Sequence, residues 1–384
     1  MKFDRTEEQQ QLAASIDRFI QRDYDFAVRT KIVASADGWG REGWKTMAAL
    51  GLLGLPLPAE FGGFGGGAVD SMGVMEAIGA ALIVEPYVPT VGLGAQFVAR
   101  AGTAAQKERI LPAVVEGDLT LAFAQSEMDA RYDLARVAAR AAKQADGAYV
   151  LDGEKRMVVH GEGADLVVVS ARTAGEVADA KGISVFLVDP RADGVSLRGY
   201  RTIDGLRAAD IAFDGARVGA DALIGNEGDG LSLIEAVVDF ATALICAEAL
   251  GVIGYANDAT LEYLKTRRQF GAPIGTFQAL QHRVVDLFIE HEQVRSMASL
   301  ACGAVDTEVD ARARKRVVSA AKVRIADACR KVSQECVQLH GAMGMSDEMK
   351  VSHAFRRLTV IAQQFGDADY HLERFASPGE KGSA

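Results

Sequence analysis

The sequence is poor in the residues that cross-link or stiffen small secreted proteins. Its 384 residues include only four cysteines and eight prolines, and aromatic residues make up 7%. The cysteines lack the CxxC spacing of zinc and redox motifs, so we expect no metal site and no disulfide framework. We predict a reducing compartment in which the thiols are buried. These cysteines are Cys246, Cys302, Cys329 and Cys336.

Positive charge is also scarce. The chain has 42 Lys and Arg residues against 52 Asp and Glu residues, which gives a net charge of −10. An acidic protein of this kind is not a general binder of the phosphate backbone, so we expect no nucleic-acid partner. Hydrophobic residues reach 49% and charged residues 24%, a composition that excludes a disordered chain. The length allows two to three domains.

Long apolar runs are missing. Residues 1–11 are polar and lack the apolar segment of a signal peptide. The most apolar stretch, Ala241–Ala256, contains Glu248 and is shorter than the roughly 20 residues that cross a bilayer. We therefore expect no membrane span and a cytoplasmic protein.

The hydrophobic period changes twice along the chain. A period of 3.6 residues predicts helices before Leu119 and again after Gly225, whereas short apolar runs separated by glycines predict strands between them. The fold class is therefore α+β, mostly α. We predict an N-terminal helical domain over residues 1–117, a β-barrel-like middle domain over 118–224 and a C-terminal four-helix bundle over 225–384. The order differs from the alternating βαβ pattern of a Rossmann fold.

The predicted elements follow from these periods. Helices are expected at residues 12–20, 42–50, 72–83, 104–115, 231–266, 277–305, 311–339 and 347–362. Strands are expected at residues 119–124, 148–151, 166–170, 183–188 and 211–213. The glycine-rich loop at residues 61–67 follows a proline-containing loop and precedes no Lys-Ser/Thr pair. We therefore favour a structural turn over a phosphate-binding loop, with ligand contact as the alternative.

Three motifs, in order along the chain, resemble those of the acyl-CoA dehydrogenase family. They are L-P-L-P-A-E-F-G-G at residues 55–63, T-R-R-Q-F-G at residues 266–271 with the following I-G and F-Q pairs, and V-Q-L-H-G at residues 337–341 with Gly344. The likeness extends from Phe3 to about Arg374. Phe365–Leu372 is typical of the small subunit of pimeloyl-CoA-type dehydrogenases, a group that includes partners in α2β2 enzymes acting on dicarboxylic or steroid side-chain thioesters.

The resemblance implies dehydrogenation of an acyl-CoA thioester with FAD as cofactor. In the family a glutamate takes the α-proton, and it occupies one of two positions. Alignment places Phe365 at the first and Ala241 at the second, and Thr242 replaces a neighbouring arginine. Neither Phe365 nor Ala241 can accept a proton, so we predict no catalytic residue in this chain.

The segments that in the family hold a chain's own flavin are altered. The family's T-E-P-x-A-G-S-D loop aligns with residues 126–133, where Arg131 and Tyr132 replace glycine and serine. The W-I-T/S strand aligns with Met157–Val159, and valine cannot donate the hydrogen bond of the family's hydroxyl. Ser126 remains a candidate polar contact to FAD.

Contacts that the family sends to a neighbouring subunit's FAD are kept. The resemblance places Arg267, Phe270, Gln278, Gln338 and Gly341 near the adenosine and pyrophosphate of that cofactor. A guanidinium suits a pyrophosphate, and glycine permits close approach of the backbone. The contacts to a neighbour's FAD are kept, whereas the segments for the chain's own flavin are altered. The resemblance therefore implies that this chain is the non-catalytic partner of a homologous α subunit, in a heterodimer or an α2β2 tetramer.

Alternatives remain for single residues and for the whole chain. Arg267 also suits the C-terminus of a helix as an exposed cap. Glu248 could form a structural hydrogen bond, contact a subunit or replace the missing base, and His340 and His371 are interpreted as packing or interface residues. For the chain, the alternatives are a complete homodimeric dehydrogenase that uses Glu248 or Asp239 as base, and a non-redox acyl-CoA-binding scaffold.

Overall fold

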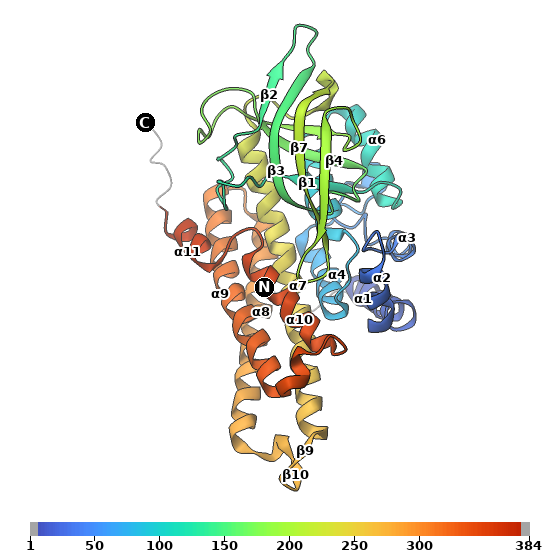
Figure 1. Ribbon diagram of the computed structural model, residues 1–384, viewed down its shortest axis with the longest axis vertical. Helices are drawn as coiled ribbons and strands as arrows, with labels where there is room; N and C mark the ends of the chain where they lie inside the picture. Colours follow the sequence, from blue (N-terminus) through green and yellow to red (C-terminus); the bar gives the residue numbers. More distant parts are fainter. Residues whose placement is uncertain (1–6, 378–384) are drawn as a thin grey trace. The chain divides into compact units, whose positions relative to one another are not determined.

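Helices far apart in the sequence assemble into one unit of the computed structural model, which describes residues 7–377 (Figure 1). Within the described residues, this helical unit draws on residues 7–30, Ala68–Ile83 and residues 242–377. Its helices are α1 (Glu7–Asp23), α4 (Ala68–Ala81), α7 (Gly230–Thr266, from Thr242 onward), α8 (Gln278–Thr307), α9 (Ala311–His340), α10 (Lys350–Gln363) and α11 (Ala368–Ala376). Two short strands, β9 (Arg268–Gln269) and β10 (Ala272–Pro273), form a hairpin between α7 and α8.

The predicted four-helix bundle is formed by α7, α8, α9 and α10. Each contributes a buried apolar stripe to one core, as Leu250, Val294, Ile325 and Leu358 illustrate. Burying such a side chain stabilises the fold by roughly 1.5–3 kcal/mol. The helix α4 packs closely on α7 because each contributes a glycine to the crossing: a Cβ on Gly79 would collide with the Glu248 carbonyl.

The second unit, Lys31–Gly67 and Val84–Ala241, contains the sheet. Its helical elements are α3 (Arg41–Ala49), a 3-10 turn (Ala59–Phe61), a π-helix (Val88–Gly94), α5 (Ala95–Ala101), α6 (Ala104–Val115), a second 3-10 turn (Ala220–Ala222) and the start of α7. In the sequence, α2 (Phe26–Ala34) spans the junction of the two units. The strands are β1 (Leu121–Ala124), β2 (Arg140–Lys143), β3 (Tyr149–Val159), β4 (Leu166–Arg172), β5 (Ile183–Val188), β6 (Val195–Arg201), β7 (Arg207–Val218) and β8 (Leu223–Ile224).

The strands form one mixed sheet rather than the predicted barrel. Their order is β6-β7-β3-β2-β4-β5-β8, with β1 paired in parallel to β4. Among the described residues the outer strands β6 and β8 do not pair with each other, so the sheet is open. The sequence pattern predicts alternation and turns but not the closure of a sheet, because closure depends on register between its first and last strands.

Most predicted elements are confirmed, but the prediction misses several short helices and strands of the structure. The four long C-terminal helices and α6 match within a few residues. The sequence pattern does not reveal the strands β2, β6 and β8 or the helices α2, α5 and α11. The division into domains at residues 117 and 224 stays a prediction.

The glycine-rich loop is a structural turn in which the backbone amides are already bonded. The amides of Phe64, Gly65 and Gly66 donate to the carbonyls of Gly54, Leu57 and Leu55 at 2.9, 2.7 and 3.0 Å. A side chain on Gly63 would collide with the carbonyl of Leu57. These amides are therefore committed to the turn rather than to a phosphate.

One helix, α7, is long and apolar enough to cross a membrane by length and composition alone. However, 94% of its most apolar window is buried inside the protein, as in the core helix of a soluble protein. The sequence prediction underestimates this apolar run because Glu248 interrupts it, and the structure pairs that carboxylate internally.

Candidate cofactor site

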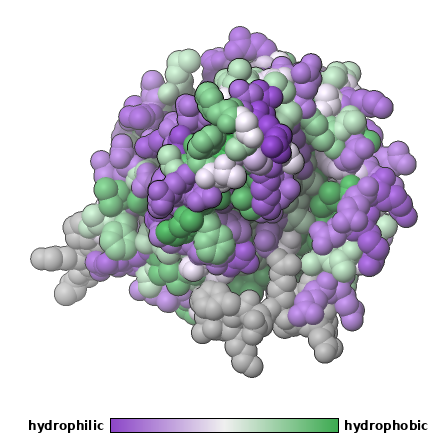
Figure 2. Space-filling model, turned by 90° about the horizontal axis from the view of Figure 1, so that it is seen from below, coloured by the Kyte–Doolittle hydropathy of each residue, from purple (hydrophilic) through white to green (hydrophobic). Residues whose placement is uncertain are grey.

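Three helices of the helical unit meet at one end, beside the β9–β10 hairpin. Tyr263 of α7 stacks on His340 of α9 with ring centroids 4.6 Å apart, which joins the last turns of these helices. Arg283 of α8 donates to Glu335 of α9 at 2.7 Å. This end of the unit, seen from below in Figure 2, carries apolar patches among hydrophilic ones. Side-chain contacts thus join the three helices at this end, which exposes both apolar and hydrophilic side chains.

The hairpin presents an aromatic residue in a strained conformation. Gln269 pairs with Ala272, so Phe270 and Gly271 form the two-residue turn, with φ of 52° and 80°. Such turns favour asparagine and glycine, and a bulky residue with positive φ is an outlier. The Phe270 side chain is 92% exposed. Its ring meets that of Phe277 edge-on, with centroids 6.2 Å apart, and most of its surface stays accessible to a ligand or partner.

Five of the six candidate cofactor residues lie at this end of the helical unit. Arg267, Phe270, Gln278, Gln338 and Gly341 are all exposed. Arg267 directly follows α7, and its amide donates to Tyr263 at 2.8 Å, so the interpretation as a helix cap stays open. Gly341 has φ of 63° and open space where a Cβ would stand. The cationic, amide and aromatic groups exposed at this end of the unit have the chemistry that suits the adenosine-pyrophosphate half of FAD.

Phe365 lies in a turn that two buried side chains hold in place. The turn has φ of 61° at Phe365 and 123° at Gly366. Lys322 Nζ donates to the carbonyls of Gly366 and Ile361 at 2.8 and 2.9 Å. His371 Nε2 lies 3.1 Å from the Phe365 carbonyl, which can only accept, so Nε2 carries the proton. The position that the family gives to its base is thus rigid and holds no carboxylate.

The second base position is apolar, and the substitute base is engaged elsewhere. Ala241 is fully buried. Glu248 is 4% exposed, and its two oxygens accept from Arg357 Nε and Nη2 at 2.5 and 2.7 Å. This buried, bidentate pair with Arg357 occupies both oxygens of the carboxylate. The structural role of Glu248 is therefore favoured over that of a base.

His340 and His371 both lie buried and act as packing residues. His340 is buried and its Nδ1 lies 2.8 Å from the Cys336 carbonyl. His371 is buried between Phe365 and Ser319, and burial, aided by Lys322 and Arg374, lowers the pKa of its imidazole to about 3. A neutral His371 suits the carbonyl and hydroxyl that face it.

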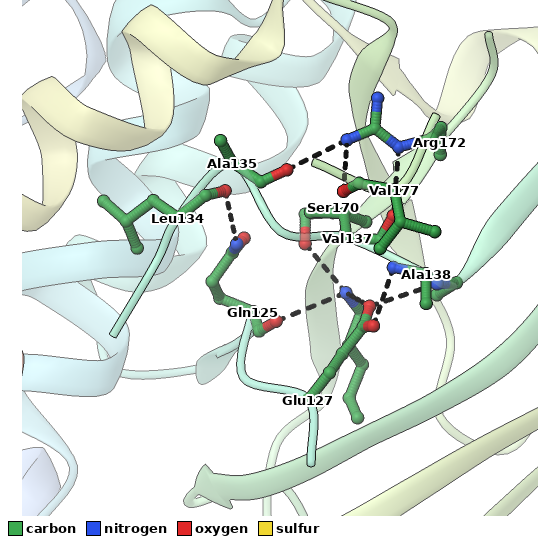
Figure 3. Close-up of polar contacts among 11 residues, drawn as sticks. Gln125, Glu127, Leu134, Ala135, Val137, Ala138, Ser170, Arg172 and Val177 are labelled. Atoms are coloured by element: carbon green, nitrogen blue, oxygen red, sulfur yellow. Dashed lines mark hydrogen bonds and ion pairs between the residues drawn. The ribbon is translucent and has the colours of Figure 1, made fainter. Parts of the chain in front are cut away.

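The loop that carries Ser126 belongs to the sheet unit and is tied to β3 and β4 by buried charges (Figure 3). Lys155 of β3 is fully buried and donates to Glu127 Oε1 at 2.7 Å, to Ser170 Oγ at 3.0 Å and to the Gln125 carbonyl at 3.3 Å. Burial lowers the pKa of Lys155 to about 8, although Glu127 opposes this. Ser126 itself is exposed.

The strand that aligns with the family's flavin strand is bulged. The register of β3 against β7 shifts between Lys155 and Val158, and Met157 lies in the bulge with φ of 54°. Asp210 of β7 accepts from the Met157 amide at 3.2 Å and from Arg156 at 2.7 Å. The Met157 side chain is thereby exposed, but it brings neither an aromatic ring nor a donor. The ring end of FAD fits this chain less well than the adenosine end.

Sequence reasoning did not identify Lys155, Arg172 or Lys322 as organising residues. Lys155 stands in the charged run Glu154–Arg156, which resembles a solvated strand edge. The period-2 alternation of β3 places it on the buried face beside Leu151 and Gly153, and this register is the signal that could have found it. Among the described residues, no group of three or more His, Cys, Asp or Glu side chains could hold a metal ion.

Family profiles match nearly the whole chain. The N-terminal, middle and C-terminal domains of acyl-CoA dehydrogenase match residues 6–118, 122–216 and 228–377. A mitochondrial isovaleryl-CoA dehydrogenase from Pongo abelii is 30% identical over 74% of this chain and 68% of its own length.

Solved structures show the same fold. Butyryl-CoA dehydrogenase from Megasphaera elsdenii has a TM-score of 0.88 at 25% identity, covering 98% of both chains. The ChsE4-ChsE5 complex from Mycobacterium tuberculosis has a TM-score of 0.87 at 27% identity, covering 98% of this chain and 100% of the compared one. The chain belongs to the acyl-CoA dehydrogenase family of FAD-dependent oxidoreductases.

Proposed function

We propose that this chain is the partner subunit of a heteromeric acyl-CoA dehydrogenase and lacks a catalytic carboxylate of its own. The observation that carries the proposal is the pair Phe365 and Ala241, which occupy both positions where the family places its base. Glu248 does not replace that base, because Arg357 binds both of its oxygens. The base that takes the proton from the α-carbon of the thioester would then come from a homologous α subunit.

The chain's own residues would bind and orient the cofactor. Bound FAD would supply the electron sink for the β-hydrogen of the acyl-CoA thioester. Arg267 would neutralise the pyrophosphate, Gln278 and Gln338 would offer amide hydrogen bonds, and Gly341 would admit the ligand close to the backbone. The assembly would be a heterodimer or an α2β2 tetramer in the cytoplasm. The substrate class proposed is a dicarboxylic or steroid side-chain thioester.

A complete homodimeric enzyme is the second candidate. The observation that favours it is the full-length match to butyryl-CoA dehydrogenase, which covers 98% of both chains. It would need a base other than Glu248, and Asp239 is a buried carboxylate of the first part of α7. The non-redox scaffold has no observation in its favour.

Purification with and without an α subunit tests the proposal. The chain is expressed alone and together with candidate homologous partners, and acyl-CoA oxidation is measured with an artificial electron acceptor, alongside flavin per chain. We expect turnover only in the complex. Turnover by the isolated chain at an ordinary enzymatic rate, about 1–1,000 per second, would contradict the proposal and support the homodimer.

A further inference from the structure

The sheet unit contains a small cavity that is lined by none of the candidate cofactor residues. Four segments distant in sequence line it, and all belong to this one unit: the residues before α3, those before and in the π-helix, the end of β3 and the start of β7. The cavity has about 30 Å³ of space for the centres of water molecules. A buried water needs about 10–15 Å³ by this measure, so the space suits roughly two.

One lining residue, His160, is held in an unfavourable backbone conformation. Its φ is 63°, in the left-handed region that non-glycine residues adopt at some cost, and its amide donates to the Arg207 carbonyl at 2.8 Å. The imidazole meets the Trp39 ring edge-on, with centroids 5.2 Å apart. A Cβ on Gly163 would lie 2.8 Å from the imidazole Cε1 and 3.2 Å from Nδ1, so this edge of the ring packs against the backbone. The ring is therefore fixed, and Nε2 lies with Cδ2 on its other edge.

The fixed imidazole is buried without a hydrogen bond at Nε2. His160 is 4% exposed, and its Nε2 has no partner among the described residues. Burial lowers the pKa of the imidazole to about 3, although Asp165 opposes this, so the ring is neutral. Buried polar atoms are almost always bonded to the protein or to ordered water. A partner from outside the chain is therefore expected at Nε2.

Opposite charges line the same cavity. The Glu85 residue is 5% exposed, and its Oε1 accepts from the Gly40 amide at 3.2 Å. The Arg207 guanidinium donates through Nη2 to the carbonyls of Ser35 and Ala36 at 2.7 and 2.9 Å. Its buried Nε has no hydrogen-bond partner within the part of the chain that the structure describes. The carboxylate disfavours an anion and the guanidinium disfavours a cation, so the charges favour a neutral occupant.

We propose that this cavity is a hydration site, in which ordered water bonds to His160 Nε2 and to the charged groups of Glu85 and Arg207. Water is small enough for the space, and it can both donate to the carboxylate and accept from the guanidinium. Water bonded to both His160 and Glu85 would connect the end of β3 with the segment before the π-helix. The inference goes beyond the proposed function and does not depend on it, because every lining residue belongs to the sheet unit.

Crystal structures of the full chain at high resolution, grown with and without sodium formate, test the site. We expect water density within about 2.7–3.2 Å of His160 Nε2 in both crystals. Formate density in place of water would overturn the proposal in favour of an anion site. A cavity without density would also overturn it, as would an imidazole whose Nε2 bonds to a protein group.

Oxygen-17 relaxation dispersion tests the same site in solution, because it reports long-lived internal waters. His160→Phe and His282→Phe make the same change at a buried and at an exposed position. Phenylalanine offers water no hydrogen bond, so His160→Phe should lower the signal by the contribution of a bound water, whereas His282→Phe should not change it. Equal signals from His160→Phe and wild type would contradict the proposal. Should His160→Phe fail to fold, the wild-type crystals still decide the question.

Discussion

Two adjacent arginines follow α7, and only one matches the family's cofactor contact. Arg267→Ala removes a cation from the candidate pyrophosphate contact, whereas Arg268 Nη2 lies 3.5 Å from the Gly271 carbonyl of its own hairpin. A charge-assisted hydrogen bond contributes about 1.5–3 kcal/mol, so we expect FAD affinity of the assembled complex to fall roughly tenfold to a hundredfold. Flavin titration of both alanine variants checks this. Equal losses for Arg267→Ala and Arg268→Ala would point to general electrostatics rather than a specific contact.

Buried neutral histidines predict loss of stability in acid. Burial lowers the pKa of both His160 and His371 to about 3, below the ordinary value of 6.5. The unfolded chain therefore binds more protons between these pH values. The contribution to stability is complete above pH 6.5 and is lost as the pH falls towards 3. Each histidine should reduce the free energy of unfolding by about 1.4 kcal/mol per pH unit in this window.

Urea unfolding at pH 7 and pH 5 measures this dependence. His371→Gln removes one titrating group, so its free energy of unfolding should fall less steeply between the two pH values than that of wild type. The comparison uses the difference between pH values, because the substitution also removes the contacts of His371 with Phe365 and Ser319. Identical pH dependence in both proteins would contradict this, because it would show that His371 binds a proton in the folded state as readily as in the unfolded chain.

At the scale of elements, the crossing of α4 and α7 depends on a glycine from each helix. A Cβ on Gly251 would collide with the Glu76 carbonyl, so Gly251→Ala forces the helices apart and should destabilise the fold by about 1–3 kcal/mol or more. Gly254, one turn along α7, meets only the His291 ring, at 3.2 Å. Gly254→Ala should cost much less than Gly251→Ala, because a side-chain ring can shift where a backbone carbonyl cannot and alanine favours a helix by about 1 kcal/mol over glycine. Thermal unfolding of both variants tests the contrast.

The elements that the sequence predicted are those whose burial follows one period over many residues. The helix α9 keeps an apolar stripe over 30 residues, so its bounds follow from the pattern. Strand β6 is partly exposed on both faces and β2 has only four residues, so neither carries a detectable alternation. Whether the sheet stays open or closes, and which residues Lys155 and Arg172 bind, depends on residues distant in sequence, which no local pattern encodes.

At the scale of the whole molecule, α8 presents surface that suits a protein partner. Val285, Phe288 and Ile289 are 55%, 61% and 45% exposed on consecutive turns of this helix. Large apolar side chains that are exposed together on one helix face are typical of surfaces that bind another protein. The same helix begins at Gln278, so the candidate cofactor end and this apolar face belong to one element. A partner on α8 would thus be brought close to the residues proposed to bind FAD.

The proposed function makes catalysis depend on the assembly, so restoring one residue should not supply it. Phe365→Glu places a carboxylate at a family base position, in a turn that Lys322 and His371 already fix. The isolated variant should still show less than about 1% of the turnover of the complex, because Met157 and Val159 leave the flavin strand altered and loss of one member of a catalytic unit removes most activity. Steady-state assays of the isolated variant, with Phe365→Gln as the uncharged control, measure this. Turnover in the glutamate variant that approaches the complex and is absent from the glutamine variant would show that the chain already contains every other part of an active site.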